Sequence, residues 1–238
     1  MLIKVINPNT SEPMTEAIER SARAVAGVDV RAVTAPMGPA SIESHYDEAL
    51  AVPGVLAELG DADGYVIACF GDPGLDAARE VAAGPVVGMA EAAMRAASYL
   101  GRGFSVVTTV DRSRGRTWDL AERYGVARFC RGVHACGIRV LELDSDPDAL
   151  KTITAACRHA LERDESDAVV LGCAGMTHLV ADLTAEVGVP VVDGVQAATL
   201  AVQSLLAMGL RTGKNGEFAA PPPKPFSGLL HGFGEPRR

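Results

Sequence analysis

The chain has 238 residues, of which 48% are hydrophobic and 22% are charged, and its formal net charge is -8. This length suits one large domain or two compact lobes, and the composition is that of an ordinary globular protein that needs no disulfides. The net negative charge and the lack of a basic block argue against nucleic acid as a partner. The sequence has no apolar run of roughly eighteen residues, so we expect no membrane span.

Apolar runs typical of strands alternate with segments of helical period. The predicted strands are residues 2–7, 28–34, 64–69, 86–89, 104–109, 137–143, 168–173 and 191–193. The predicted helices are residues 14–26, 75–83, 90–99, 114–124, 149–164 and 197–208. Several of the strands are apolar throughout, as strands buried on both faces of a parallel sheet are. The alternation predicts an α/β fold with parallel sheets, followed from about Gly213 by an extended, proline-rich tail.

One stretch of the chain occurs twice. The segments that begin DGYVIACFGDPG and SDAVVLGCAGM each contain an acidic start, an apolar strand, a cysteine, a small-residue turn, a helix, a Pro-Val-Val strand and a second helix. The cysteines are 173 − 69 = 104 residues apart and the Pro-Val-Val strands 190 − 85 = 105. A weaker match, VINP at 5–8 and VVTT at 106–109, precedes them. The duplication predicts two similar α/β lobes with one cysteine in each.

Both repeated cysteines, Cys69 and Cys173, end a predicted parallel strand, where ligands bind in open α/β sheets. Each is followed by a turn and a helix, whose N-terminus favours the thiolate and predicts a pKa lowered from about 8.5 toward neutrality. If the lobes face each other, one thiolate can remove a proton from a carbon while the opposite thiol returns one. That chemistry is racemisation, and it requires neither a metal nor another cofactor.

The other three cysteines, Cys130, Cys136 and Cys157, are interpreted as small buried residues. The odd total of five cysteines and the lack of a signal-peptide pattern predict a reducing, cytoplasmic location. The lack of a CxxC pair argues against a structural zinc site.

Polar residues near other strand ends leave two interpretations open. Asn9 and Thr10 either bind a polar substrate or, with Ser11, belong to a helix cap. Thr108 and Thr109 either face the site or only favour a strand.

Three further polar positions favour structural roles. Ser41 and Glu43 suit the cap of a following helix, and Asp72 suits a role in orienting its turn. His178 would form a Cys–His pair in a hydrolase, but its spacing from Cys173 places it on the next helix.

These pieces in order resemble the aspartate/glutamate/hydantoin racemase superfamily, and within it the hydantoin and allantoin racemases. The matching segments are NPNTS at 7–11, GPASIE at 38–43, ACFGDPGL at 68–75, VVTT at 106–109 and LGCAGM at 171–176. The resemblance implies two Rossmann-like lobes with four-stranded parallel sheets, related by a pseudo-twofold axis, and an active site in the cleft between them. We expect lobe one to comprise residues 1–99 and 200–238, and lobe two residues 100–199.

The resemblance also assigns the site. It implies that Cys69 and Cys173 are the catalytic acid and base. It further implies that the substrate pocket is formed by Asn9, Ser41, Ile42, Phe70, Gly71, Thr108, Thr109, Gly172 and Ala174.

The expected substrate is a cyclic ureide. Amino-acid racemases of the superfamily carry Cys-Thr-His at the second cysteine, whereas this chain has Cys173-Ala174-Gly175-Met176, and no arginine occurs in the strand-end loops of lobe one up to Cys69 to hold a carboxylate. The turn at 71–74, GDPG, is more like allantoin racemases than hydantoin racemases. The alternatives are an aspartate or glutamate racemase, a maleate-type isomerase of the same fold, an arylmalonate-type decarboxylase, which needs only one cysteine, and a two-lobed binding protein without catalysis. We expect a homo-oligomer.

Overall fold

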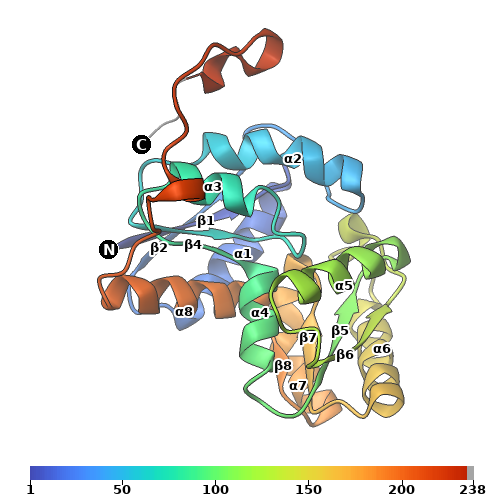
Figure 1. Ribbon diagram of the computed structural model, residues 1–238. Helices are drawn as coiled ribbons and strands as arrows, with labels where there is room; N and C mark the ends of the chain where they lie inside the picture. Colours follow the sequence, from blue (N-terminus) through green and yellow to red (C-terminus); the bar gives the residue numbers. More distant parts are fainter. Residues whose placement is uncertain (235–238) are drawn as a thin grey trace.

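The computed structural model describes residues 1–234 and contains two four-stranded, all-parallel sheets (Figure 1). The first has the order β2-β1-β3-β4 and the second the order β6-β5-β7-β8. Their strands are β1 (Leu2–Asn7), β2 (Asp29–Thr34), β3 (Gly64–Ile67), β4 (Val86–Gly88), β5 (Phe104–Thr108), β6 (Cys130–Ala135), β7 (Ala168–Leu171) and β8 (Val191–Val192). The two orders are the same after a shift of four strands, so the predicted α/β fold of two similar lobes is confirmed. We call the part around the first sheet lobe one and the part around the second lobe two.

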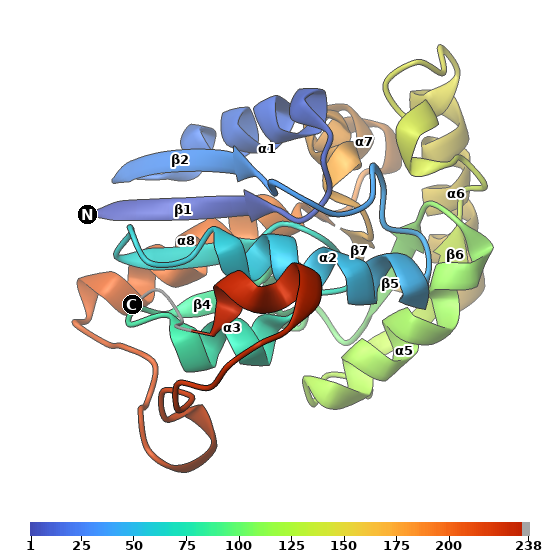
Figure 2. The same cartoon turned by 90° about the horizontal axis from the view of Figure 1, so that it is seen from above.

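Helices cover both faces of each sheet, which is why the central strands β1, β3, β5 and β7 are buried throughout or nearly so. The helices are α1 (Glu12–Val25), α2 (His45–Ala57), α3 (Leu75–Val81), α4 (Met89–Ala97), α5 (Arg114–Arg123), α6 (Ala149–Asp164), α7 (Val180–Val187) and α8 (Gly194–Ala207). In the view from above, the carboxyl ends of β1 and β2 point toward lobe two (Figure 2). The strand edge that binds ligands in α/β folds therefore faces the other lobe.

The last helix of each duplicated segment packs on the other lobe. Helix α4 follows β4 of lobe one but contacts β7, and α8 follows β8 of lobe two but contacts β3. The two helices also pack against each other (Figure 1). The lobe boundaries given above stay a prediction, and residues 235–238 of the expected lobe-one segment lie outside the described residues.

One predicted strand is wrong. Residues 137–143 are not a strand, because the chain leaves the sheet at Gly137, with φ of 83°, and forms a 3₁₀ turn at Val140–Glu142. Two apolar residues of this stretch, Ile138 and Leu143, are instead buried in the core of lobe two. The edge strand of the sheet is β6, whose Arg131 and His134 hide the strand pattern in the sequence.

Helices α2 and α7 occupy the two places where the sequence predicts a helix without giving its bounds, one after Ser41 and Glu43 and the other after Cys173. Helix α2 contains Pro53 and Gly54, which mask its period, and Gly54 packs so closely on the Met37 carbonyl oxygen that an added Cβ would lie 2.2 Å from it. Beyond α8, the tail forms 3₁₀ turns at Gly216–Phe218 and Gly228–Phe233, and it passes α3 and extends away from the sheets (Figure 1).

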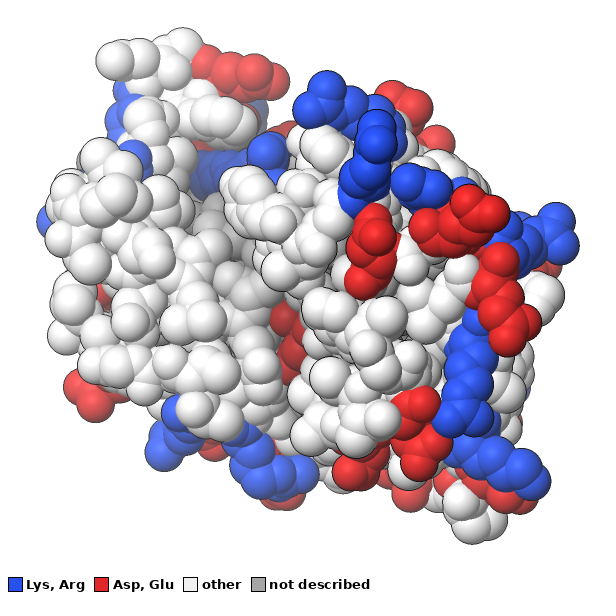
Figure 3. Space-filling model, turned by 90° about the horizontal axis from the view of Figure 1, so that it is seen from below, with Lys and Arg blue, Asp and Glu red and all other residues white. Residues whose placement is uncertain are grey.

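The underside of the molecule gathers charges of both signs toward one side and leaves a broad area without them (Figure 3). Helix α8 has no charged residue, and Leu200, Met208 and Leu210 in or just after it are exposed. Within residues 1–234, no helix is long and apolar enough to span a membrane. The expected self-association stays a prediction.

Candidate active site

Cys69 and Cys173 line one cavity between the lobes, each two residues beyond the end of an equivalent strand, β3 or β7. The empty space in this cavity is about 460 Å³, part of it open to solvent. The lining residues are Asn9, Met14, Ile42, Ala68, Cys69, Phe70, Thr108, Thr109, Ser113, Arg116, Thr117, Val140, Gly172, Cys173 and Ala174. These residues come from both lobes and surround the two cysteines, so the cavity lies where the two sheets face each other.

Most of the residues expected in the pocket line this cavity. Two do not: Ser41, next to the lining residue Ile42, and Gly71, whose backbone N–H instead binds the Cys69 sulfur. Six further lining residues were not predicted from the sequence, and they are Met14, Ala68, Ser113, Arg116, Thr117 and Val140. A signal for three of them exists, because Ser11-Glu12-Pro13-Met14 and Ser113-Arg114-Gly115-Arg116 occupy matching places at the starts of α1 and α5.

The loop after β7 lies close against the end of β5. A Cβ atom added to Gly172 would lie 2.8 Å from the Cβ of Thr108, so only glycine permits this approach. The Thr108 hydroxyl donates a hydrogen bond of 3.2 Å to the Gly172 carbonyl oxygen, which ties the strand end to the residue before Cys173. Thr108 thus shapes the loop as well as lining the cavity.

Burial raises the pKa of both thiols to about 12, which corrects the expected shift toward neutrality. Around Cys69, the positive charge of Arg116 and then the Gly71 N–H oppose this rise. Around Cys173, the Gly175 N–H opposes it. Burial removes more water from the sulfurs than the N–H groups of the following turns replace, so it favours the protonated thiol at both cysteines.

Asn9 is held in place by the turn before α1. Its Oδ1 accepts hydrogen bonds from the Asn7 side chain at 2.8 Å and from the Ser11 N–H at 2.9 Å. Its Nδ2 lies 3.1 Å from the sulfur of Met14. Ser11 is the N-cap of α1, while Thr10 is exposed and contacts the Pro39 carbonyl oxygen. The turn therefore both caps the helix and presents Asn9 to the cavity.

Ser44, rather than Ser41 or Glu43, caps α2 by accepting a hydrogen bond of 3.1 Å from the Asp47 N–H. Glu43 instead reaches across to lobe two, where its Oε1 accepts a hydrogen bond of 2.7 Å from the Val140 N–H. Since Val140 lines the cavity, this bond joins the two lobes at its wall.

Asp72 orients the loop after Cys69, as its place in the turn suggested. Its N–H donates to the Cys69 carbonyl oxygen at 2.9 Å, and its φ of 46° is a conformation that side chains rarely adopt. Its carboxylate accepts hydrogen bonds from the N–H groups of Ala90 and Glu91 at 3.0 Å each and from the Tyr124 hydroxyl at 2.6 Å. His178 is exposed and does not line the cavity, so no Cys–His pair forms there.

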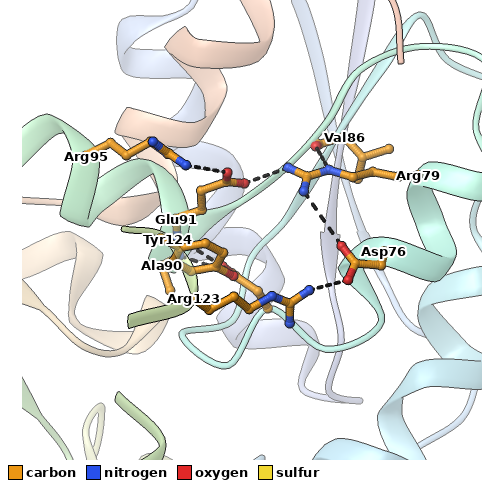
Figure 4. A network of polar contacts seen from close by, with 9 residues as sticks. Asp76, Arg79, Val86, Ala90, Glu91, Arg95, Arg123 and Tyr124 are labelled. Atoms are coloured by element: carbon orange, nitrogen blue, oxygen red, sulfur yellow. Dashed lines mark hydrogen bonds and ion pairs between the residues drawn. The ribbon is translucent and has the colours of Figure 1, made fainter. Parts of the chain in front are cut away.

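An ion-pair network continues from this buried carboxylate toward the surface (Figure 4). Arg79 pairs with Glu91 at 2.6 Å, and Glu91 pairs with Arg95 at 3.4 Å. Arg123, next to Tyr124 on α5, pairs with Asp76 on α3. The network therefore links the loop after Cys69 to lobe two through α5.

A family model described as Asp/Glu/Hydantoin racemase matches residues 3–202. The chain is 43% identical to the hydantoin racemase of Pseudomonas sp. (strain NS671), with 98% of this chain and 97% of the relative covered. It is 45% identical to the hydantoin racemase of Rhizobium meliloti, with 96% and 98% covered. These relatives match the chain over nearly its whole length.

Solved structures agree with this likeness. The allantoin racemase from Klebsiella pneumoniae has a TM-score of 0.93 at 45% identity, covering 97% of this chain and 98% of that one. The allantoin racemase of Pseudomonas fluorescens has a TM-score of 0.90 at 37% identity, covering 96% and 100%. An arylmalonate decarboxylase, at 19% identity with a TM-score of 0.63, shares the fold alone.

Proposed function

Because this chain belongs to the Asp/Glu/hydantoin racemase family and is an isomerase of the racemase type, we propose that it racemises a cyclic ureide, either allantoin or a 5-substituted hydantoin. The observation that carries the proposal is the pair of cysteines, Cys69 and Cys173, which line one cavity from equivalent places in two similar lobes.

In the proposed reaction, the ring carbon lies between the two sulfurs. One thiolate removes the proton from one face, the electron pair of the C–H bond moves onto the adjacent ring carbonyl, and the opposite thiol protonates the other face. The product is the mirror image of the substrate, and the two sulfurs have exchanged their protonation states. Because burial favours the protonated form of both thiols, one of them must first release its proton to solvent.

The cavity suits a neutral, polar ring. Its walls supply hydroxyl and amide groups from Asn9, Thr108 and Thr109, which can bind ring carbonyl and N–H groups. A ring carbon between a carbonyl and a nitrogen carries a proton acidic enough for a thiolate to remove, and the same proton in a free amino acid needs further activation.

One arginine, which the sequence reasoning missed, bears on the amino-acid alternative. Arg116 is the single charged residue among those lining the cavity, all of which lie in the described part of the chain. Its guanidinium is already paired with Glu48 at 3.1 Å, so it does not offer a free positive charge to a substrate carboxylate. This pairing favours the cyclic ureide over aspartate or glutamate.

The test is circular dichroism of single enantiomers of allantoin and of a 5-substituted hydantoin, incubated with the protein in heavy water. We expect the signal to decay to zero while deuterium enters the recovered substrate, and the faster substrate identifies the physiological class. Signals that change no faster than in a protein-free control would overturn the proposal. Glutamate, aspartate and maleate, assayed in parallel, would then decide between the alternatives.

A further inference from the structure

Two cavity residues in equivalent positions, Met14 and Arg116, differ in charge, since only Arg116 is charged. Met14 is the third residue of α1, Arg116 is the third residue of α5, and each helix follows the first strand of its lobe. Both side chains line the cavity. A thioether thus stands on one side of the pseudo-twofold axis where a guanidinium stands on the other.

Each of these residues faces the cysteine loop of the opposite lobe. A Cβ atom added to Gly71, two residues after Cys69, would lie 3.7 Å from the Nε of Arg116 and 3.0 Å from a carboxylate oxygen of Glu48. A Cβ atom added to the equivalent Gly175 would lie 3.4 Å from the Met14 methyl group and 2.8 Å from a methyl group of Leu143. One cysteine loop therefore lies against an ion pair and the other against two apolar side chains.

The charges near the two sulfurs differ accordingly. Cys69 faces the cation of Arg116, with Glu48 and the Cys173 sulfur as weaker negative influences. The ionisable groups that act on Cys173 are Cys136, Glu43 and Asp144, all of which oppose a negative charge on its sulfur. The Arg116 and Glu48 side chains are only 12% and 20% exposed, so solvent screens them weakly.

We propose that Arg116 is a positioning residue that makes the two cysteines unequal, so that Cys69 is the thiol that gives up its proton first while Cys173 stays protonated. This inference rests on the proposed two-cysteine reaction and names the form in which that reaction starts. Glu48 limits the effect by drawing the guanidinium charge toward itself.

The inequality has a kinetic consequence. An enantiomer whose proton faces Cys69 reacts with the form in which Cys69 is ionised and Cys173 is protonated. After the reaction, Cys69 is protonated and Cys173 is ionised. The enzyme must then return to its starting form by exchanging protons with solvent. Enantiomers have equal free energies, so kcat/KM is the same in both directions, whereas kcat and KM separately differ between the enantiomers.

Thiol alkylation tests the inference without any substrate. Iodoacetamide reacts with a thiolate to form a thioether and iodide, and peptide mass spectrometry measures the rate at each cysteine. Cys69 and Cys173 are both half-buried residues, so access alone does not separate them. We expect Cys69 to react about tenfold faster than Cys173, as a difference of about one pKa unit would produce.

Three variants and one control test the direction of the expected effect on the alkylation preference. Arg116→Met, which copies the residue at the equivalent position, should remove the preference, and Arg116→Lys should retain most of it. Glu48→Gln frees the guanidinium and should increase the preference. Met14→Leu is the matched control and should leave the preference unchanged, and far-ultraviolet circular dichroism checks that each variant is folded.

The possible outcomes distinguish failure of the role proposed for Arg116 from failure of the proposed racemisation. If Arg116→Met and Glu48→Gln shift the preference in the same direction, the ion pair only holds the lobes together and the inference is overturned. Equal alkylation of both cysteines in the wild-type protein also overturns it, even when racemisation is found. If the wild-type protein racemises neither allantoin nor the hydantoin but shows the alkylation preference, the proposed function is refuted instead.

Discussion

Two buried carboxylates, Asp72 and Asp193, occupy equivalent places in the two lobes but come from different positions in the chain. Asp193 follows β8 directly and caps α8 by accepting a hydrogen bond of 2.9 Å from the Val195 N–H. The equivalent position in lobe one is Gly88, which has no side chain. The carboxylate there belongs to Asp72, and a Cβ atom added to Gly88 would lie 2.2 Å from its Cγ.

Each carboxylate also accepts a hydroxyl from the helix that follows the other lobe's first strand. Ser21 on α1 donates to Asp193 at 2.5 Å, and Tyr124, which caps the C-terminus of α5, donates to Asp72 at 2.6 Å. The fold thus requires an acceptor where a buried helix begins beside the opposite lobe, but leaves open which residue supplies it. The symmetry is one of positions in space rather than of positions in the sequence.

The strongest test of the equivalence of the lobes uses their cysteines. Cys69→Ser and Cys173→Ser should each lower the racemisation rate by about 10²–10⁴-fold, the usual contribution of a positioned acid or base. Polarimetry measures the rate, and Cys157→Ala, a substitution within the core of lobe two, should retain it. A protein that tolerates either serine substitution does not use both thiols.

The two carboxylates are the next target. Asp72→Ala and Asp193→Ala should each lower the free energy of unfolding by about 2–4 kcal/mol, since each leaves buried N–H and hydroxyl donors without an acceptor. Urea denaturation measures both values. Losses of less than about 1 kcal/mol would mean that water replaces the carboxylate without cost.

A transplant sharpens this comparison. Gly88→Asp alone should destabilise the protein because the new side chain would collide with Asp72. Combining it with Asp72→Gly moves the carboxylate to the place that Asp193 has in lobe two and removes a side chain from a residue with φ of 46°. The double variant should be more stable than either single variant, and additive losses would contradict the equivalence.

The protonation of Asp72 predicts a smaller, pH-dependent effect. Burial raises its pKa from 3.8 to about 6, against the opposing hydrogen bonds from Tyr124, Ala90 and Glu91. The folded state therefore binds this proton more tightly than the unfolded state, and the contribution to stability is complete below pH 3.8 and is lost as the pH rises through about 6. Relative to Asp72→Asn, the wild-type protein should lose about 3 kcal/mol over this window in urea titrations. Parallel pH profiles would refute this assignment.

The smallest effect is expected at the surface. Arg123 and Asp76 join α5 to α3 across the lobes, but their side chains are 46% and 55% exposed. Arg123→Ala should therefore change the free energy of unfolding by less than about 1 kcal/mol, and less still at high salt. A larger loss, measured alongside Asp72→Ala, would show that the outer network rather than the buried carboxylate ties the lobes.

The sequence by itself determined the elements whose local pattern agrees with their surroundings. Strand β1 and helix α6 have the predicted bounds, because four of the six residues of β1 are apolar and α6 has a clear helical period. The duplicated pattern also placed Cys69 and Cys173 at equivalent strand ends, since strand order and direction follow from the alternation of elements.

Only the tertiary structure decided the rest. Residues 137–143 have the pattern of a strand, but their apolar side chains pack into a core that no local rule reveals. Arg116, Glu48 and the exchange of α4 and α8 between the sheets depend on contacts between segments far apart in the chain. The thiol pKa values likewise depend on how the two lobes pack together. Burial and nearby charge, which set these pKa values, are properties of the assembled cavity.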